Sequence, residues 1–228
     1  MPKSLIIAGA GGHGREVLWL VKNINKQSLR YKVIGFCDDD PALKSTTFNG
    51  YPVLGRAEEI ALETTTKLHF VVGIGNNELR KAVAVRLESL GWEAETLIDP
   101  SSVVADDVSI GAGTYVGVLA NISPTAIIGR HAIVHNQSSV GHDVVMADFS
   151  QVAPGGRVLG HVNVGECGYL GSNAVICPSV NLGSHAVLGA SSFAISDIPE
   201  YAVALGVPAR VKIKNKEPSD LKFKANDS

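Results

Sequence analysis

The chain has 228 residues, 45% of them hydrophobic, and a formal net charge of −2 at pH 7. Its apolar content is high enough for a hydrophobic core, which excludes a disordered chain, and its near-neutral charge argues against a nucleic-acid-binding protein. The 24 glycines point to many tight backbone corners.

The N-terminal part of the chain alternates strand and helix signals. Residues 4–8 form a short apolar run that ends in glycines, which predicts a buried strand. Apolar residues at helical spacing follow from Val17 to Ile24, and they predict a helix. Further strands are predicted at residues 32–37, 68–73 and 94–98.

A second helix is predicted after the strand at residues 68–73. Asn76 or Asn77 is placed to cap it, because an asparagine side chain can accept a hydrogen bond from a free amide of the first turn. Its apolar face recurs from Leu79 to Leu90. The alternating order of strands and helices predicts a small Rossmann-like parallel α/β domain, residues 1–99.

The second part of the chain repeats with a period of six residues. From Val104 to Leu188 every sixth residue is aliphatic or Met, fifteen times in succession, and the residue after each is mostly small. This period fits neither a lone α-helix nor a flat sheet, but it fits short parallel strands wound into a β-helix. The predicted β-helix domain covers residues 100–210, and a polar tail, residues 211–228, follows.

The cysteines and the apolar runs bear on location. Three cysteines give no even set and no C-x-x-C pair, which favours a reduced, cytoplasmic setting. The apolar run at residues 5–8 is too short for a secretory signal peptide. No window approaches the ~18 uninterrupted apolar residues of a membrane-spanning helix. A cytoplasmic protein without membrane insertion is therefore expected.

Four segments, together with the repeat, carry a family resemblance. They are G-A-G-G-H-G-R-E-V from Gly9, F-C-D-D-D from Phe36, G-I-G-N-N-E-L-R from Gly73 and N-Q-S-S-V-G-H-D from Asn136. With them the whole chain resembles the bacterial nucleotide-sugar acetyltransferases of the bacillosamine and perosamine type, which are related to the sialic acid O-acetyltransferases. The resemblance implies a left-handed β-helix, in which fifteen hexapeptides make five coils.

The resemblance also implies an activity. It points to an acetyl-CoA-dependent N-acetyltransferase that acts on the amino group of a nucleotide-linked 4-amino-4,6-dideoxy sugar for glycan or O-antigen biosynthesis. UDP is the preferred nucleotide, with GDP or dTDP as alternatives. The implied assembly is a homotrimer with active sites between subunits. Two other functions stay open: O-acetylation of a sialic acid or another sugar hydroxyl, and a NAD-binding or regulatory protein with a structural β-helix.

His142 and Asp143 are the predicted catalytic residues. A histidine can accept the proton of an attacking amine near neutral pH. By resemblance, the acid beside it orients the imidazole, as the acid of a catalytic triad does. His161 lies 18 residues after Asp143, which is one coil of the repeat, and we expect a structural ion pair between them. Direct transfer is expected, because the cysteines offer no paired nucleophile.

Zinc is the alternative role for the histidines of the repeat. A zinc site needs three or four convergent ligands, and the spacing of these residues does not reproduce the close pair expected of β-helix zinc enzymes. No metal is therefore expected at His131, His135, His142, His161 or His185.

The glycine-rich turn after the first strand is the predicted nucleotide site. Residues 9–14 fit G-x-G-x-x-G between a strand and a helix, a pattern that binds diphosphates at a helix N-terminus. The domain is too small for a full dinucleotide-binding fold, and by resemblance it binds the nucleotide-sugar. The predicted contacts are Gly11, Gly12, His13, Gly14, Asp38, Asp39, Asn76, Asn77 and, on the repeat, Asn136.

The predicted acetyl-CoA site lies between neighbouring β-helices. By resemblance, a backbone amide near Gly160 meets the acetyl carbonyl, and Arg210 can approach the CoA phosphates. The other predicted contacts are Gln151, Ala190 and Gly206. The chain departs from the family pattern at Gln151, where relatives commonly have His, and before His142, where they often have one more residue.

Overall fold

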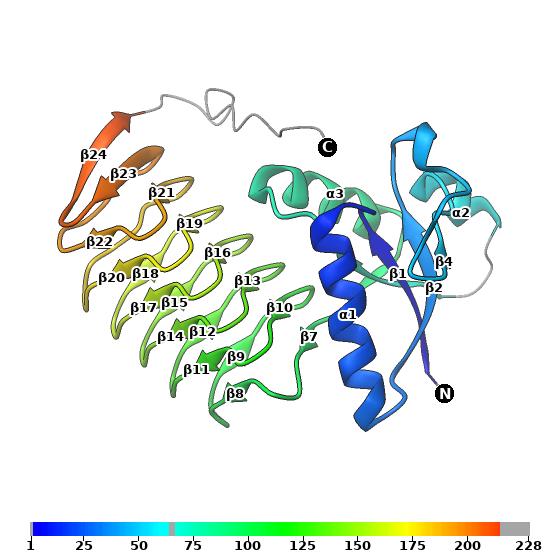
Figure 1. Ribbon diagram of the computed structural model, residues 1–228, viewed down its shortest axis with the longest axis horizontal. Coiled ribbons are helices and arrows are strands. Elements are labelled where there is room, and N and C mark those ends of the chain that lie inside the picture. Colours follow the sequence, from blue (N-terminus) through cyan, green and yellow to red (C-terminus); the bar gives the residue numbers. More distant parts are fainter. Residues whose placement is uncertain (1, 64–66, 215–228) are drawn as a thin grey trace.

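The protein has two parts in a computed structural model that describes residues 2–63 and 67–214 (Figure 1). Residues 3–94 form a parallel sheet with flanking helices, and the chain then winds into a left-handed parallel β-helix. The fold class predicted from the sequence is therefore confirmed. Within the described residues, none of the helices has the length and the apolar character needed to cross a bilayer.

The N-terminal sheet has the strand order β2-β1-β5-β6, with all neighbours parallel. Its strands are β1 (Lys3–Ala8), β2 (Tyr31–Cys37), β5 (His69–Val72) and β6 (Glu93–Ala94). Helix α1 (Gly12–Gln27) buries the apolar face that the helical spacing predicts. Helix α3 (Asn77–Ser89) begins after Asn76, whose side chain accepts a hydrogen bond from the Leu79 amide at 2.9 Å.

The structure adds short elements that the sequence pattern did not reveal. They are a 3₁₀ turn (Pro41–Leu43), the hairpin of β3 (Thr47–Phe48) and β4 (Tyr51–Pro52), and helix α2 (Ala57–Glu63). The prediction of one strand over residues 94–98 is wrong. Residues 93–94 form β6 of the N-terminal sheet, whereas β7 (Leu97–Ile98) pairs with β10 of the β-helix. The β-helix thus begins three residues before the predicted boundary at residue 100.

The β-helix is a three-sided prism, and its faces are numbered here in the order in which the chain meets them. The first face holds β7, β10 (Tyr115–Val116), β13 (Ile133–Val134), β16 (Gln151–Val152), β19 (Tyr169–Leu170), β21 (Val187–Leu188), β23 (Ala202–Gly206) and β24 (Ala209–Lys214). The second holds β8 (Val103–Val104), β11 (Asn121–Ile122), β14 (Ser139–Val140), β17 (Arg157–Val158), β20 (Val175–Ile176) and β22 (Phe193–Ala194). The third holds β9 (Ser109–Ile110), β12 (Ile127–Ile128), β15 (Val145–Met146) and β18 (Asn163–Val164).

The β-helix has about six turns, one more than the fifteen strict hexapeptides predict. The coil continues past the repeat with a shorter turn, since Leu182 pairs with Ile198 only 16 residues further on. β24 then runs back antiparallel to β23 as far as Lys214. The first residues of the predicted polar tail, 211–214, therefore belong to a strand, and residues 215–228 lie outside the described part of the chain.

The repeat works as its periodicity predicts. The aliphatic residues point inward and form one continuous buried cluster, which stabilises the prism because each coil covers the apolar side of the next. The small corner residues allow the coils to approach closely. A Cβ on Gly141 would lie 2.8 Å from the Gly160 amide nitrogen of the next coil, so a larger residue at this corner would force the coils apart.

The N-terminal part packs on the first face of the prism and on the turns that lead into it from the third face. Helices α1 and α3 lie beside this side of the β-helix (Figure 1). Leu5 and Val17 share a buried cluster with Tyr115 and Ile133 of the first face. Phe149 joins a second buried cluster with residues of the N-terminal sheet. The two parts are therefore joined by a shared apolar core.

Candidate functional site

A cleft of about 460 Å³ lies at the carboxyl ends of β1, β2 and β5. Ligands of open parallel sheets bind at this edge, because loops from several strands converge there. The lining residues are Ala8, Gly9, Gly11, Gly12, His13, Cys37, Asp38, Asp39, Gly73, Ile74, Gly75, Leu79, Val83 and Arg86.

The glycines of the turn after β1 divide into two kinds. At Gly11 and Gly12, an added Cβ would meet no atom within 4 Å, so their backbone is open toward the cleft. A Cβ at Gly14 would lie 2.0 Å from the carbonyl oxygen of Gly9, so this glycine lets α1 pack against the turn. Gly11 offers α1 no side-chain cap, which leaves the first-turn amides for a ligand or water. Gly11, Gly12 and His13 line the cleft as predicted, whereas Gly14 does not.

The two predicted acids at the end of β2 have different partners. The Asp38 carboxylate accepts hydrogen bonds from the amides of Ala10 at 2.8 Å and Asp40 at 3.0 Å, which ties the glycine-rich turn to β2. The Asp39 carboxylate accepts two bonds from the Arg86 guanidinium, at 2.8 and 3.0 Å. Arg86 lines the same cleft, and no motif in the sequence singled it out. Its position in the third turn of an otherwise ordinary helix carried no signal of its own.

The prediction that Asn76 and Asn77 line the nucleotide site is not supported by their positions. Asn76 is occupied as the cap of α3. The Asn77 side chain points the other way, and its amide donates to the Cys167 carbonyl of the β-helix at 2.9 Å. Neither side chain contributes to the cleft lining.

His142 and Asp143 stand in the turn between β14 and β15, which joins the second and third faces. His142 Nδ1 and Asp143 Oδ2 are 2.7 Å apart, and the other carboxylate oxygen accepts a bond from the Thr125 hydroxyl, also at 2.7 Å. The hydrogen bond from His142, followed by that from Thr125, lowers the pKa of Asp143. An ionised Asp143 is an acceptor only, so Nδ1 carries the proton and Nε2 keeps its lone pair. His161 Nδ1 lies 3.7 Å from the same carboxylate, close enough for the predicted ion pair when the imidazole is protonated.

Gly160 lies directly against the His142 ring. A Cβ at this position would meet Cε1 and Nε2 of the ring at 2.6 Å, so only glycine leaves room for the imidazole as it stands. Among the described residues the Gly160 amide donates no hydrogen bond within the chain. A backbone N–H without a partner in the chain can donate to a developing oxyanion.

Asn136 and Gln151 have structural partners in this chain. Asn136 Oδ1 accepts a hydrogen bond from the Val118 amide at 2.9 Å, so the side chain stacks along the prism. Gln151, 7% exposed, is buried between the two parts of the molecule and lies 3.5 Å from Arg80 Nη1. The predicted contact of Gln151 with acetyl-CoA does not agree with this burial, because the N-terminal part covers the side chain.

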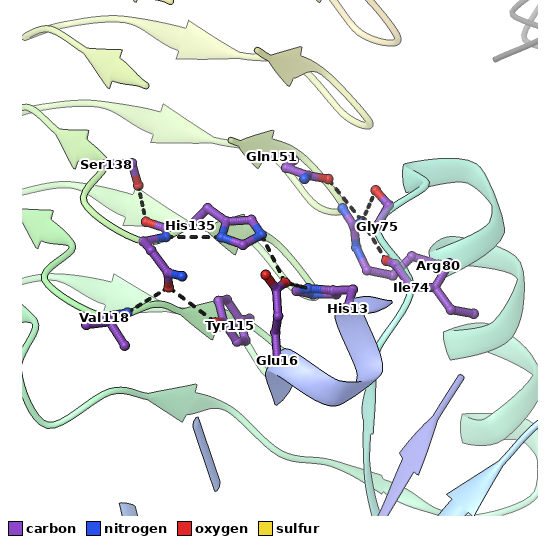
Figure 2. A network of polar contacts seen from close by, with 11 residues as sticks. His13, Glu16, Ile74, Gly75, Arg80, Tyr115, Val118, His135, Ser138 and Gln151 are labelled. Carbon is purple, nitrogen blue, oxygen red and sulfur yellow. Dashed lines mark hydrogen bonds and ion pairs between the residues drawn. The ribbon is translucent and has the colours of Figure 1, made fainter. Parts of the chain in front are cut away.

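A second histidine cluster lies where α1 meets the first face (Figure 2). His13 Nδ1 is 2.9 Å from the Glu16 carboxylate, and His135 Nε2 is 3.6 Å from it. Burial lowers the pKa of His135 to about 4, with a smaller effect from His13. His135 Nδ1 accepts a bond from the Asn136 amide at 3.1 Å, so Nε2 holds the proton of the neutral ring. The nitrogen that faces Glu16 then has no lone pair for a metal ion.

Three predicted CoA contacts gather at the end of the β-helix. Ala190, Gly206 and Arg210 are all exposed. Gly206 has a φ of +106° at the tip of the β23–β24 hairpin, a conformation that suits glycine, and its amide donates to the Ser192 hydroxyl at 3.0 Å. Ala190 and Gly206 lie on the corner between the first and second faces, whereas His142 lies on the next corner.

The cleft and the His142 corner are on different sides of one chain. The N-terminal part covers the first face, and the turn that carries His142 joins the two other faces. In a three-sided prism that corner is opposite the first face. One chain therefore does not bring its own cleft to its own His142.

Comparison with known proteins places these features in a family. Residues 4–87 match the family described as the PglD N-terminal domain. The chain is 33% identical over 172 residues to the GDP-perosamine N-acetyltransferase of Escherichia coli O157:H7, an alignment that covers 75% of this chain and 76% of that protein.

Solved structures agree over almost the whole chain. A His→Asn variant of perosamine N-acetyltransferase from Caulobacter crescentus, in complex with CoA and GDP-perosamine, matches with a TM-score of 0.85 and 28% identity, covering 92% of this chain and 96% of that one. The acetyltransferase domain of PglB from Neisseria gonorrhoeae FA1090 matches with a TM-score of 0.83 and 28% identity, covering 92% and 100%. With a cleft at the sheet edge and a His–Asp pair on the β-helix, this chain belongs to the perosamine- and bacillosamine-type N-acetyltransferases, which transfer an acetyl group from acetyl-CoA to the amino group of a nucleotide-linked sugar.

Proposed function

We propose that the protein acetylates a GDP-linked 4-amino-4,6-dideoxy sugar, with His142 as general base. The observation that carries the proposal is the His142–Asp143 pair, with Nδ1 and Oδ2 2.7 Å apart and Nε2 on the side of the ring that faces Gly160. Nε2 takes a proton from the amine as it attacks the thioester carbonyl. The Gly160 N–H stabilises the negative charge that develops on the carbonyl oxygen. As the C–S bond breaks, the His142 imidazolium gives its proton to the leaving sulfur, so CoA departs as its thiol and the base is restored.

Transfer is direct in this proposal, without an acyl-enzyme. Burial raises the pKa of both Cys37 and Cys167 to about 12, so these side chains stay protonated thiols near neutral pH. A thiol is a poor nucleophile compared with its thiolate. Neither cysteine lies in the turn that holds His142.

The names of two relatives favour GDP over UDP, the nucleotide that the family resemblance had placed first. The Escherichia coli and Caulobacter relatives are named for GDP-perosamine.

The cleft and the catalytic corner come together between subunits in this proposal. A homotrimer of prisms would set the cleft of one subunit against the His142 corner of its neighbour. The exposed residues Ala190, Gly206 and Arg210 would line the acetyl-CoA channel along the same seam, with Arg210 near the phosphates.

The test is release of CoA thiol from acetyl-CoA with GDP- and UDP-linked 4-amino-4,6-dideoxy sugars. The wild type should release thiol with the GDP-linked sugar, and His142→Ala should lower kcat by roughly 10²–10⁴-fold, as loss of a general base does. His161→Ala is the matched control, because it removes the other imidazole on the Asp143 carboxylate and should keep most of the activity. A His142→Ala variant with wild-type kcat would exclude the base. Thiol release with a sugar hydroxyl acceptor but no amino sugar would exclude N-acetylation.

A further inference from the structure

Arg80 is a buried cation without an acidic partner. It is 1% exposed, and it is the largest of the fully buried residues in the described part of the chain. Burial lowers the pKa of Arg80 to about 10, which leaves the guanidinium charged at neutral pH. Among the described residues it forms no salt bridge, and its acceptors are carbonyl and amide oxygens. Burying a charged group is costly unless its N–H donors are satisfied. The groups that accept hydrogen bonds from Arg80 therefore indicate which parts of the molecule this side chain connects.

On one side the Arg80 side chain holds the β-helix. Nε donates to the carbonyl of His131 at 2.9 Å, and Nη2 donates to the carbonyl of Phe149 at 2.6 Å. These two residues occupy equivalent turns, 18 residues and one coil apart, and both have a positive φ. The guanidinium therefore binds two successive coils at the same corner.

On the other side the same side chain holds the wall of the cleft (Figure 2). Nη1 donates to the carbonyls of Ile74 and Gly75, both at 3.2 Å. Ile74 and Gly75 follow β5 and line the cleft. One planar group thus connects the nucleotide cleft with the β-helix, and its fixed fork of donors sets the spacing between them.

We propose that Arg80 is a positioning residue for the nucleotide: it fixes the loop of residues 73–75 against the β-helix and so sets the shape of the cleft. The inference rests on the proposed function, in which this cleft binds the GDP part of the substrate. This proposal distinguishes two kinds of contact between the N-terminal part and the β-helix. Contacts that reach the cleft loop should affect nucleotide binding, and contacts that only join the two parts should not.

Lys81 provides the matched control from the same helix. Its ammonium pairs with Glu166 of the β-helix at 2.7 Å, so it also joins α3 to the prism. Lys81 is not among the residues that line the cleft. Asn77 provides a milder probe of Arg80, because its side chain accepts a bond from Arg80 Nη2 at 2.8 Å.

The experiment is calorimetric titration of the full chain with GDP and, separately, with CoA. Arg80→Lys keeps the charge but replaces the fork with a compact ammonium, and we expect its GDP affinity to fall about 10-fold or more with CoA affinity unchanged. Asn77→Ala should show a smaller loss in the same direction, and Lys81→Gln should bind GDP like the wild type.

Several results would overturn the inference. They are an unchanged GDP affinity in Arg80→Lys, an equal loss for GDP and CoA, and an equal GDP loss in Lys81→Gln. If Arg80→Lys does not fold, Asn77→Ala decides, since unchanged GDP binding there would overturn the role and a selective loss would support it. A wild-type chain that binds no GDP would instead refute the proposed nucleotide site, and the role of Arg80 with it.

Discussion

Asp143 controls which nitrogen of His142 can act. The carboxylate is held by His142 on one oxygen and by Thr125 on the other, and both bonds lower its pKa. In Asp143→Asn the amide can rotate and donate to Nδ1, which leaves the proton on Nε2, where the base is needed. We expect kcat to fall by roughly 10²-fold with little change in the KM of either substrate.

Steady-state kinetics against both substrates would check this, with Thr125→Val as the control. That variant removes the hydrogen bond from the Thr125 hydroxyl to Asp143 but keeps the carboxylate that faces His142. Its kcat should stay much closer to that of the wild type. An Asp143→Asn enzyme with full kcat would show that the imidazole needs no partner.

His135 makes the stability of the protein depend on pH. Its pKa lies at about 4 in the folded chain, against a value of 6.5 for a free imidazole, chiefly because the ring is buried. The groups facing it are His13, Glu16 and Tyr115. Between these two pH values the unfolded chain binds a proton that the folded chain refuses. The free energy of unfolding therefore falls as the pH drops through this window, by about 3 kcal/mol for this residue.

His135→Gln should reduce that fall. Urea unfolding at several pH values from neutral to about pH 4 would measure it, by comparing the slopes of the wild type and the variant. His161→Gln is the control for the loss of an imidazole, because His161 is exposed on the corner opposite the first face, and the fall due to the buried ring should remain in this variant. A His135→Gln slope equal to that of the wild type would show that the buried ring does not drive the pH dependence.

The proximity of residues was predictable where the repeat sets it. His142 and Asp143 are adjacent, and the repeat places Gly160 and His161 one coil further, so the closeness of these residues follows from spacing, whereas the catalytic role proposed for them comes from the family resemblance. The contacts of Asn77, Gln151 and Arg80 could not be predicted from spacing, because their partners depend on how the N-terminal part packs against the prism. A sequence period describes each part of the molecule separately, and it contains no information about the surface that joins them.

At the scale of elements, different glycines of the turn between β1 and α1 serve packing and ligand binding. A Cβ at Gly14 would lie 2.0 Å from the Gly9 carbonyl oxygen, within rigid backbone. Gly14→Ala should therefore lower the free energy of unfolding by about 1–3 kcal/mol or more, a drop of several degrees in Tm. Gly12→Ala adds its methyl group toward the cleft, where nothing lies within 4 Å. It should keep the wild-type Tm and weaken GDP binding.

Thermal unfolding and GDP titration on the two variants would check this pair. A Gly14→Ala chain as stable as the wild type would mean that α1 shifts to accommodate the methyl group. Unchanged GDP binding in Gly12→Ala would place the phosphates away from this turn.

Elements were predictable in proportion to how often their pattern recurs. The aliphatic period of six specifies the inward face of each coil, and the buried cluster follows it. Residues 94–98, between the two parts, were predicted as one strand but contribute to two different sheets. Strands that short are determined by their partners rather than by their own side chains, and the partner of β7 comes 18 residues later.

At the scale of the whole molecule, one chain holds both halves of the proposed site but does not bring them together. The cleft lies against the first face of the prism, and His142 stands on the opposite corner. In the proposed trimer, each site takes its cleft from one subunit and His142 from the next. Two inactive variants with damage in different halves should then restore activity when they share a trimer.

The variants for this test are His142→Ala and Arg86→Ala, the second chosen because Arg86 lines the cleft. If subunits unfold and reassemble at random from an equal mixture, a site is intact only when an undamaged cleft meets an undamaged His142. That happens for about a quarter of the sites, so thiol release should recover to about a quarter of the wild-type rate. Light scattering on the same samples should give three times the chain mass of 23.9 kDa. A trimer whose mixed form stays inactive would place both halves of the site in one chain, and that would require the N-terminal part to leave the first face on binding substrate.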